Sequence, residues 1–393
     1  MITGDTYRPL ILTGKSQSLG HCIGKLIVND NVDSKNKYIQ VICTNNLSMF
    51  SEGYCGYIFE DLIIPEDMIN YLTISSVPYL TGVSNTNTLV KNDVLEIISV
   101  KHIAKVLLRA NSGDNALVVT SNCNCNCIMC PEPLSVRQSS SPPISNILEF
   151  IDLIENDIKY LCITGGEPTL LRDNLFPILD ECKNKFKNTS FTFLTNARMF
   201  SYKRYAYDFN VHRPSRILIG VPLYGHTAQI HDLITDTSGS FIQTVNGIKN
   251  LLDLDLKVEI RIVVNKINFK YLYSISNYII ENFPNIFRVN IMALEMLGNA
   301  IVNKGVVWVH YDQIKTDVKM AALNLINNGI ETYVYNFPLC LTDEKLWTIC
   351  IKSISDYKVR YFDECEKCSV KEKCGGFFSS TINTKGLQVH PVY

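Results

Sequence analysis

The segment Ser121–Pro131, SNCNCNCIMCP, constrains this chain more than any other stretch. It carries Cys123, Cys127 and Cys130 in a C-x3-C-x2-C spacing. Three thiolates this close together on one loop can ligate three irons of a 4Fe–4S cluster. No fourth cysteine follows at a matching spacing, so one iron would stay open to bind a substrate. Cys125 sits between the ligands and is expected to point away from the irons.

A zinc site is the main alternative for these cysteines. Zinc usually takes four ligands from paired C-x2-C units, and no partner pair lies near this loop in the sequence. A chance cluster is a second alternative, because the chain contains 14 cysteines. The spacing favours an iron–sulfur cluster over both.

At this loop the sequence resembles the radical S-adenosylmethionine (SAM) enzymes. Their cluster motif is C-x3-C-x2-C, with an aromatic or apolar residue before the last cysteine, here Met129. The resemblance implies that Cys123, Cys127 and Cys130 are the metal ligands and the catalytic centre, and that the open iron binds the amino and carboxylate groups of SAM. Reduction then splits SAM into methionine and a 5′-deoxyadenosyl radical, which removes a hydrogen atom from the substrate; the cofactor carries that chemistry.

The length and composition indicate a folded protein of two or three units. The chain has 393 residues, of which 46% are hydrophobic and 19% charged. Its net charge of −1 implies no general attraction to nucleic acid or anionic lipid. We find no membrane span and no secretory signal, so the cysteines are expected to bind metal in a reducing cytoplasm rather than form disulfides.

The first part of the chain, residues 1–114, is predicted to be a small β-rich domain. Short apolar runs alternate there with clusters of Asn, Asp, Gly and Ser, and no metal-site spacing occurs. Its scattered cysteines, Cys22, Cys43 and Cys55, are expected to be buried as small apolar residues.

Residues 115–330 are predicted to form an α/β domain, a partial (β/α)6 barrel of the radical SAM type. Strand-like runs alternate with helical ones, which is typical of a parallel sheet. The expected strands are Ala116–Thr120, Tyr160–Thr164, Phe191–Leu194, Arg216–Val221, Val258–Val264 and Phe287–Ala293. The expected helices are Asn146–Ile158, Asp173–Phe186, Gly239–Leu252 and Phe269–Asn282, followed by Tyr311–Asn328. Chemistry gathers at the carboxyl ends of parallel strands, where the cysteine motif falls.

The tetrad Gly165-Gly166-Glu167-Pro168 directly follows the second expected strand. Glycines allow the backbone to approach a ligand closely, whereas a tight turn is the structural alternative. The tetrad resembles the GGE motif of radical SAM enzymes, which implies contact with the SAM amino group.

Further candidate SAM-binding residues follow later strands. Thr195 and Asn196 end the third strand and could reach the ribose or methionine part of SAM, with a capping role as the alternative; Ala197 stands where the family often has glycine. Arg261 lies inside the fifth strand and needs a partner, so it is expected to face the barrel interior. Glu295 follows the sixth strand, where the family often has an adenine-contacting segment.

The pair His231-Asp232 opens an expected polar loop after the fourth strand. Such a pair can mark a metal phosphohydrolase, but the sequence shows no second set of ligands. A structural hydrogen bond or an active-site contact is the favoured interpretation.

Residues 331–393 carry a second cysteine group. Cys365, Cys368 and Cys374 have a C-x2-C-x5-C spacing, with Cys340 and Cys350 upstream. Zinc is the alternative. The spacing resembles the auxiliary-cluster extensions called SPASM and twitch domains, and implies one auxiliary 4Fe–4S cluster. The fourth ligand is Cys340 or Cys350; we favour Cys340, which follows Pro338 in an expected loop after the strand Glu331–Tyr335, whereas Cys350 ends a short helix.

Several stretches together resemble a narrower group, the radical SAM maturases of His-Xaa-Ser systems (the HxsC type). They include LVVTSNCNCNCIMCPEP, CITGGEPTLL, PLYGHTAQIHD, VEIRIVVNK and the tail, and they extend over about residues 115–380. The resemblance implies modification of a small His-Xaa-Ser repeat peptide, together with a second radical SAM maturase and an electron donor such as flavodoxin or ferredoxin.

Two other classes of function compete with this one. The first is a different radical SAM enzyme, such as a sulfatase-type maturase or an RNA-modifying enzyme, although the chain has no basic stripe for RNA. The second is a non-catalytic iron–sulfur electron carrier, which would need no SAM pocket. Cleavage of SAM on reduction separates the carrier from the enzymes.

Overall fold

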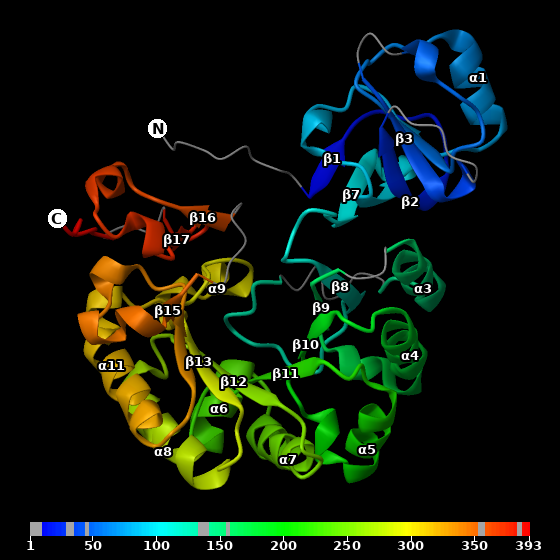
Figure 1. Cartoon of the computed structure of the whole chain (residues 1–393). Coiled ribbons are helices and arrows are strands. Elements are labelled where there is room, and N and C mark those ends of the chain that lie inside the picture. Colours follow the sequence, from blue (N-terminus) through cyan, green and yellow to red (C-terminus); the bar gives the residue numbers. More distant parts are fainter. Residues whose placement is uncertain are drawn as a thin grey trace.

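The structure is a computed structural model of the chain. It describes residues 10–28, 35–43, 47–132, 141–154, 158–352, 358–382 and 387–393. Three sheets, of seven, eight and two strands, organise these residues in chain order (Figure 1). None of the helices in these ranges is long and apolar enough to cross a membrane.

The N-terminal sheet confirms the expected β-rich domain. Its strand order is β1-β7-β6-β2-β3-β4-β5; the strands are β1 (Ile11–Thr13), β2 (His21–Val28), β3 (Tyr38–Ile42), β4 (Gly56–Phe59), β5 (Tyr79–Leu80), β6 (Val94–Ile98) and β7 (Ile103–Leu108). Strands β2 to β5 are parallel, and β1, β7, β6 and β2 pair antiparallel. Helix α1 (Glu66–Ile74) connects β4 to β5; it follows Pro65 and has two acidic residues in its first turn, which suit a helix start.

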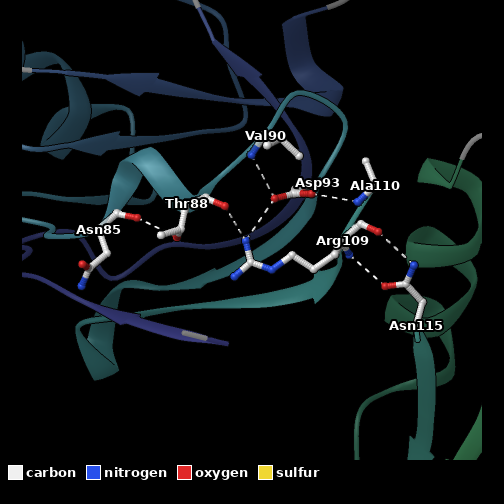
Figure 2. A network of polar contacts seen from close by, with 7 residues as sticks. All are labelled: Asn85, Thr88, Val90, Asp93, Arg109, Ala110 and Asn115. Carbon is white, nitrogen blue, oxygen red and sulfur yellow. Dashed lines mark hydrogen bonds and ion pairs between the residues drawn. The ribbon is translucent and has the colours of Figure 1, made fainter. Parts of the chain in front are cut away.

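A polar network joins the end of β7 to the start of the next sheet (Figure 2). The buried Asp93 carboxylate accepts hydrogen bonds from the Ala110 N–H at 2.8 Å and from Arg109 at 3.3 Å. The Asn115 side chain bonds both the N–H and the C=O of Arg109, each at 2.9 Å. Because removing one partner would leave a buried charge unpaired, this network fixes the joint between the two sheets.

The eight-stranded sheet is the predicted partial barrel. Its order is β15-β14-β13-β12-β11-β10-β9-β8, and every pairing within it is parallel. The strands are β8 (Ala116–Thr120), β9 (Tyr160–Gly165), β10 (Ser190–Leu194), β11 (Ile217–Pro222), β12 (Val258–Val263), β13 (Arg288–Met292), β14 (Thr332–Tyr335) and β15 (Cys350–Ile351). All six expected strands are present. Strand β14, which was expected as Glu331–Tyr335, and strand β15 extend the same sheet to eight strands.

Helices cover the outside of this curved sheet (Figure 1). They are α3 (Ile144–Leu153), α4 (Leu175–Lys185), α5 (Lys203–His212), α6 (Ala228–Thr235), α7 (Ser240–Leu252), α8 (Leu272–Asn282), α9 (Asn299–Val302), α10 (Lys304–Val307) and α11 (Tyr311–Asn327). Part of the expected helix Asn146–Ile158 falls at residues 155–157, outside the described residues. The polar loop expected at His231 is instead helix α6, because apolar Ile230 and Ile234 pack one turn apart against the core.

The tail combines short 3-10 helices with a two-stranded sheet. The helices are η8 (Leu339–Leu341), η9 (Glu344–Ile349), η11 (Asp363–Lys367) and η12 (Lys371–Lys373), and the antiparallel strands are β16 (Val359–Arg360) and β17 (Phe377–Phe378). Because β14 and β15 pair with the barrel sheet, the residues just after 330 belong to that sheet. The division at residues 114 and 330 remains a prediction.

Candidate active site

The cysteine loop, residues 121–132, follows β8 at the carboxyl end of that strand. Cys123, Cys127 and Cys130 are partly exposed, whereas Cys125 is buried. The Cys125 sulfur lies 3.6 Å from the Nδ2 atom of Asn196, on the loop after β10. Cys125 therefore faces a neighbouring loop, whereas the thiols of Cys123, Cys127 and Cys130 are partly exposed.

The two glycines of the GGEP tetrad pack against the backbone of the cysteine loop. A Cβ atom on Gly165 would lie 2.2 Å from the Thr120 carbonyl oxygen, and one on Gly166 would lie 2.2 Å from that of Asn122. The N–H of Gly166 donates to the Thr120 oxygen at 2.8 Å, and the N–H of Glu167 donates to the Asn122 oxygen at 2.7 Å. In this structure the glycines are required by the approach of the cysteine loop itself.

The Glu167 carboxylate links the loops after β9 and β10. It is 1% exposed and accepts from the Thr195 hydroxyl at 2.6 Å and from the Asn196 N–H at 2.6 Å. Thr169 donates to it as well, through its hydroxyl at 2.5 Å and its N–H at 3.2 Å. Burial raises the pKa of Glu167, although these four hydrogen bonds act in the opposite direction. Glu167, Thr195 and Asn196 are thus brought together as one hydrogen-bonded unit.

Ala197 adopts the left-handed backbone conformation that glycine would favour. Its φ angle is +61°, in the left-handed region, and its carbonyl oxygen faces Gly247, where a Cβ atom would lie 2.1 Å away. The next residue, Arg198, donates to the carbonyl of Asn124 in the cysteine loop and to Gln243 at 2.7 Å. The LTNAR stretch therefore supports the cysteine loop through a residue that sequence reasoning missed.

A second missed support comes from the loop after β13 and from helix α9. The Asn299 N–H donates to the Cys130 oxygen at 2.9 Å, and its side chain donates to the Cys127 oxygen at 3.0 Å. Asn303 donates to the Ile128 oxygen at 2.8 Å. Gly298 has a φ angle of +57°, and a Cβ atom there would lie 2.3 Å from the Pro131 oxygen. The feature of the sequence that could have indicated this support is a glycine followed by two asparagines after a barrel strand.

His231 and Asp232 both accept structural hydrogen bonds from backbone N–H groups. His231 is 1% exposed, and its Nδ1 atom accepts from the Tyr224 N–H at 3.1 Å. Burial lowers the pKa of His231 to about 4, so its ring is neutral near pH 7. Asp232 accepts from the N–H groups of Gly239 and Phe241, both at 2.7 Å, at the start of α7.

Tyr224 connects this pair to the cysteine loop. Its ring stacks on the His231 ring, with centroids 5.6 Å apart, and packs into the apolar cluster that contains Met129. Burial, and then the nearby Cys127 and Cys130, raise the pKa of Tyr224 well above its usual value. A buried, neutral phenol therefore lies beside two predicted ligands.

Arg261 faces the barrel interior with a charged partner on its own strand. Its Nε atom lies 2.9 Å from Glu259, which is two residues earlier and so on the same face. Glu259 also pairs with Arg288 of β13 at 2.5 Å. Cys162 of β9 faces the same interior. Burial raises the pKa of its thiol to about 11, although the nearby Arg261 acts in the opposite direction.

Glu295 connects the barrel to the tail. It lies after β13, and its carboxylate pairs with Lys358 at 3.2 Å. The next residue, Met296, donates its N–H to the Thr381 hydroxyl at 3.4 Å. The tail is therefore attached at the carboxyl end of the barrel sheet, on the same edge as the cysteine loop.

The tail cysteines gather around one pocket, which we call the cysteine pocket. Cys340, Cys365, Cys368 and Cys374 line it together with Tyr361, Phe377 and other residues. Cys350 does not line it, although Cys374 lies near enough to contribute, after burial, to raising the pKa of Cys350 to about 12. The structure brings the four predicted auxiliary ligands together.

Backbone N–H groups point at the sulfurs of the cysteine pocket. Leu339 and Gly376 donate to Cys374 at 3.4 and 3.5 Å, and Val392 donates to Cys368 at 3.4 Å. Hydrogen bonds to thiolate sulfurs are a feature of iron–sulfur sites. Within the described ranges no three His, Cys, Asp or Glu side chains meet around a single metal ion. Cysteines that bind a 4Fe–4S cluster each ligate a different iron, so a cluster does not require three side chains to meet at one ion.

Comparisons with known proteins agree with the geometry. Residues 117–275 match the family model of the Radical SAM superfamily. The chain is 26% identical over 170 residues to the uncharacterized protein MJ0907 of Methanocaldococcus jannaschii, covering 42% of this chain and 57% of the relative. It is 26% identical over 187 residues to the antilisterial bacteriocin subtilosin biosynthesis protein AlbA of Bacillus subtilis, covering 44% and 41%. The chain thus spans about half the length of the curated relatives it matches.

Among solved structures, Streptococcus suis SuiB bound to its precursor peptide SuiA is similar. The TM-score is 0.45 at 14% identity, with 56% of this chain and 48% of that chain covered. The family match extends from β8 to α8 and includes the cysteine loop and the GGEP tetrad. Residues 117–275 of this chain thus form a domain of the radical SAM superfamily of enzymes.

Proposed function

We propose that this protein cleaves SAM reductively and uses the resulting radical to modify a ribosomally made His-Xaa-Ser repeat peptide. The observation that carries the SAM part is the cysteine loop, which presents three partly exposed thiols at the carboxyl end of β8. The segments after β9 and β10 and the residues around α9 hold it there by hydrogen bonds. Membership of the superfamily implies a 4Fe–4S cluster and SAM at this position.

Residues of this chain would hold both groups. Cys123, Cys127 and Cys130 would ligate three irons, leaving the fourth for SAM. When bound, the cluster and SAM supply the 5′-deoxyadenosyl radical. The 165–168 tetrad, Thr195–Asn196 and Glu295 are the proposed SAM contacts, and the first two lie against the cysteine loop. Arg261, which was expected to bind SAM, lies inside β12 and pairs with Glu259, and its proposed ligand is the substrate.

We further propose one auxiliary 4Fe–4S cluster in the cysteine pocket. Cys340, Cys365, Cys368 and Cys374 would be its ligands, since all four line the pocket and Cys350 does not. The backbone N–H groups directed at Cys368 and Cys374 would stabilise the thiolates. The Glu295–Lys358 ion pair places this part of the tail next to the strand ends.

The peptide substrate is supported by sequence resemblance, and a second candidate by a relative. The stretches shared with His-Xaa-Ser maturases favour a His-Xaa-Ser peptide, a second radical SAM maturase as partner, and flavodoxin or ferredoxin as electron donor. AlbA is a bacteriocin biosynthesis protein, which favours a peptide of another class as the alternative. Either reaction requires a reducing cytoplasm that protects iron–sulfur clusters.

The test is a reconstituted reaction with dithionite or reduced flavodoxin, SAM and a synthetic His-Xaa-Ser peptide, with and without the partner maturase. The proposal predicts 5′-deoxyadenosine and a changed peptide mass, with deuterium moving from labelled peptide into 5′-deoxyadenosine. A parallel reaction contains whichever short peptide is encoded beside this enzyme. Modification of that peptide alone would reject the His-Xaa-Ser assignment, and absence of SAM cleavage with both clusters loaded would reject the enzymatic proposal.

A further inference from the structure

Along β8 to β10 the interior face of the barrel is partly open to solvent, in contrast to its outer face. Buried outward residues alternate with partly exposed inward residues along β10 and along β9 up to Thr164. On the edge strand β8, the inward Val118 is 54% exposed. The outward residues belong to one apolar core under the helices. A ligand can therefore reach the inner face from this side of the sheet, whereas Glu259 and Asn290 on β12 and β13 are buried.

Polar side chains occupy one row of this inner face. Parallel pairing aligns Arg261 of β12 with Asn290 of β13, and Asn290 with Tyr333 of β14. The row below contains Glu259 and Arg288, which are in register with each other and form an ion pair at 2.5 Å. Glu259 also pairs with Arg261, at 2.9 Å.

Asn290 is the exception in this row because its carboxamide has no partner. Its side chain is 0% exposed, and neither Oδ1 nor Nδ2 makes a hydrogen bond. A buried polar group without a partner destabilises a fold, whereas an apolar residue of the same shape would not. The neighbouring Arg261 Nε atom also lacks a hydrogen bond, although it lies close to Glu259. Folding alone does not account for an asparagine at this position.

We propose that Asn290 and Arg261 form a binding site for an amide group of the peptide substrate. A carboxamide offers one acceptor and two donors, so it complements a group that presents both an N–H and a C=O. The guanidinium of Arg261 adds charged donors for the carbonyl oxygen. The Arg261 side chain is one-quarter exposed, which makes it the more accessible member of the pair.

The row lies close to the strand ends. Asn290 lies two residues before the end of β13, which corresponds to about 6–7 Å below the strand ends. The row thus lies below the edge of the sheet that carries the cysteine loop. Asn290 and Arg261 are therefore specificity-determining residues that orient the peptide for hydrogen abstraction.

Stability measurements distinguish a ligand-binding asparagine from a structural one. Asn290→Leu should leave the melting temperature unchanged or raise it, because the variant removes an unpaired buried amide. The matched control is Asn250→Leu: Asn250 is also buried but donates to the Phe200 and Ser201 oxygens at 2.9 and 3.1 Å. That variant should lower the melting temperature. An equal decrease in melting temperature for both variants would overturn the proposal, because Asn290 would then be hydrogen-bonded in the folded protein.

Binding is tested on the reconstituted enzyme with a small probe that needs no knowledge of the peptide. The probe is N-acetylglycine N-methylamide, and its matched control is N-acetylglycine methyl ester, which lacks one N–H donor. Ligand-detected saturation-transfer NMR should show binding of the amide to wild type, about tenfold weaker binding of the ester, and loss of amide binding in Asn290→Leu. Equal binding of amide and ester by wild type would overturn the proposal, even if the variant failed to fold.

This inference rests on the proposed peptide substrate, but the experiments can reject either one without rejecting the other. In the full reaction, Asn290→Leu should raise the KM for the peptide about tenfold, with a smaller change in kcat. If the His-Xaa-Ser peptide is not modified while the amide probe still requires Asn290, the assigned peptide is wrong and the site remains. If the peptide is modified with an unchanged KM in Asn290→Leu, the site is wrong and the proposed function remains.

Discussion

The cysteine loop and the cysteine pocket are held by different kinds of contact. Around the loop, side chains and close-packed glycines bind the backbone: Asn299 and Asn303 bond its carbonyls, and Gly166 allows its approach. Around the pocket, backbone N–H groups bond the sulfurs themselves, as Val392 does to Cys368. The loop is positioned by residues far away in the sequence, whereas most of the pocket is built within 36 residues, from 339 to 374.

The cysteine loop offers three proposed cluster ligands, whereas the cysteine pocket offers four. A site with fewer protein ligands leaves a position for a substrate, and a closed site serves structure or electron transfer. The three-cysteine loop must therefore be rigid without further ligands, which explains its supports from distant parts of the chain. The four-cysteine pocket is closed by its own short segments. Changes to the distant supports should damage the loop and spare the pocket.

The largest effect is expected for Gly166→Ala. The new Cβ atom would lie 2.2 Å from the Asn122 oxygen and 2.6 Å from the Ser121 oxygen, and neither backbone can move without displacing the cysteine loop. Overpacking of this kind costs more than about 3 kcal/mol. We expect SAM cleavage to be lost and about half of the iron to remain. Gly305→Ala is the control, because nothing lies within 4 Å of its Cβ position; SAM cleavage by Gly166→Ala at the level of this control would contradict the packing argument.

The next effect separates the two candidate ligands of the pocket. Cys340→Ala should lose the auxiliary cluster, seen as missing iron and a missing electron paramagnetic resonance signal, because Cys340 lines the pocket. Cys350→Ala should keep both, since Cys350 lies beside the pocket and not in its lining. The reverse outcome would show that Cys350 is the fourth ligand and that the pocket rearranges on binding iron.

A lower pH should reduce the free energy of unfolding of the barrel, and His231 should account for much of that loss. Its pKa in the folded protein is about 4, against the usual 6.5, so the unfolded chain binds more protons between these values. Stability from this residue is complete above pH 6.5 and is lost as the pH falls towards 4, by about 3 kcal/mol for the whole shift. Urea unfolding at pH 7 and pH 4.5 measures the loss. His231→Asn keeps an acceptor and does not titrate, so it should show a smaller pH dependence; the same slope in both proteins would assign the loss elsewhere.

The smallest effect is expected for Ala197→Gly. Relief of the left-handed backbone stabilises by about 1 kcal/mol, and loss of a buried methyl group costs about as much. The free energy of unfolding should change by less than about 1 kcal/mol, with SAM cleavage retained. Ala197→Val should be much worse, because a β-branched residue does not tolerate a φ of +61°. Loss of SAM cleavage in the glycine variant would show that the alanine methyl itself positions the loop.

The sequence predicted the elements better than the contacts between them. Six parallel strands and four of the helices between them followed from periodicity, whereas α5 (Lys203–His212) was not expected. Helix α6 was missed because the polar residues around His231 suggested a loop, although Ile230 and Ile234 have helical spacing. Strand β15 is two residues long and becomes a strand only by pairing with β14.

The supports of the cysteine loop could not be predicted in the same way. Arg198, Asn299 and Asn303 bond the loop across 74, 172 and 175 residues of sequence, and no local pattern encodes such distances. The tetrad glycines were interpreted as room for a ligand, and they also make room for the cysteine loop. The charge partner of Arg261 was expected without being identified, since Glu259 lies on the same strand.

Iron content of the reconstituted protein tests the central claim most directly. We predict about eight iron atoms in wild type, as two four-iron clusters. The variant with Cys123, Cys127 and Cys130 all replaced by Ala should hold about four iron atoms and should form no 5′-deoxyadenosine. Loss of all iron in that variant, or zinc in place of iron in wild type, would contradict the account of two independent cluster sites.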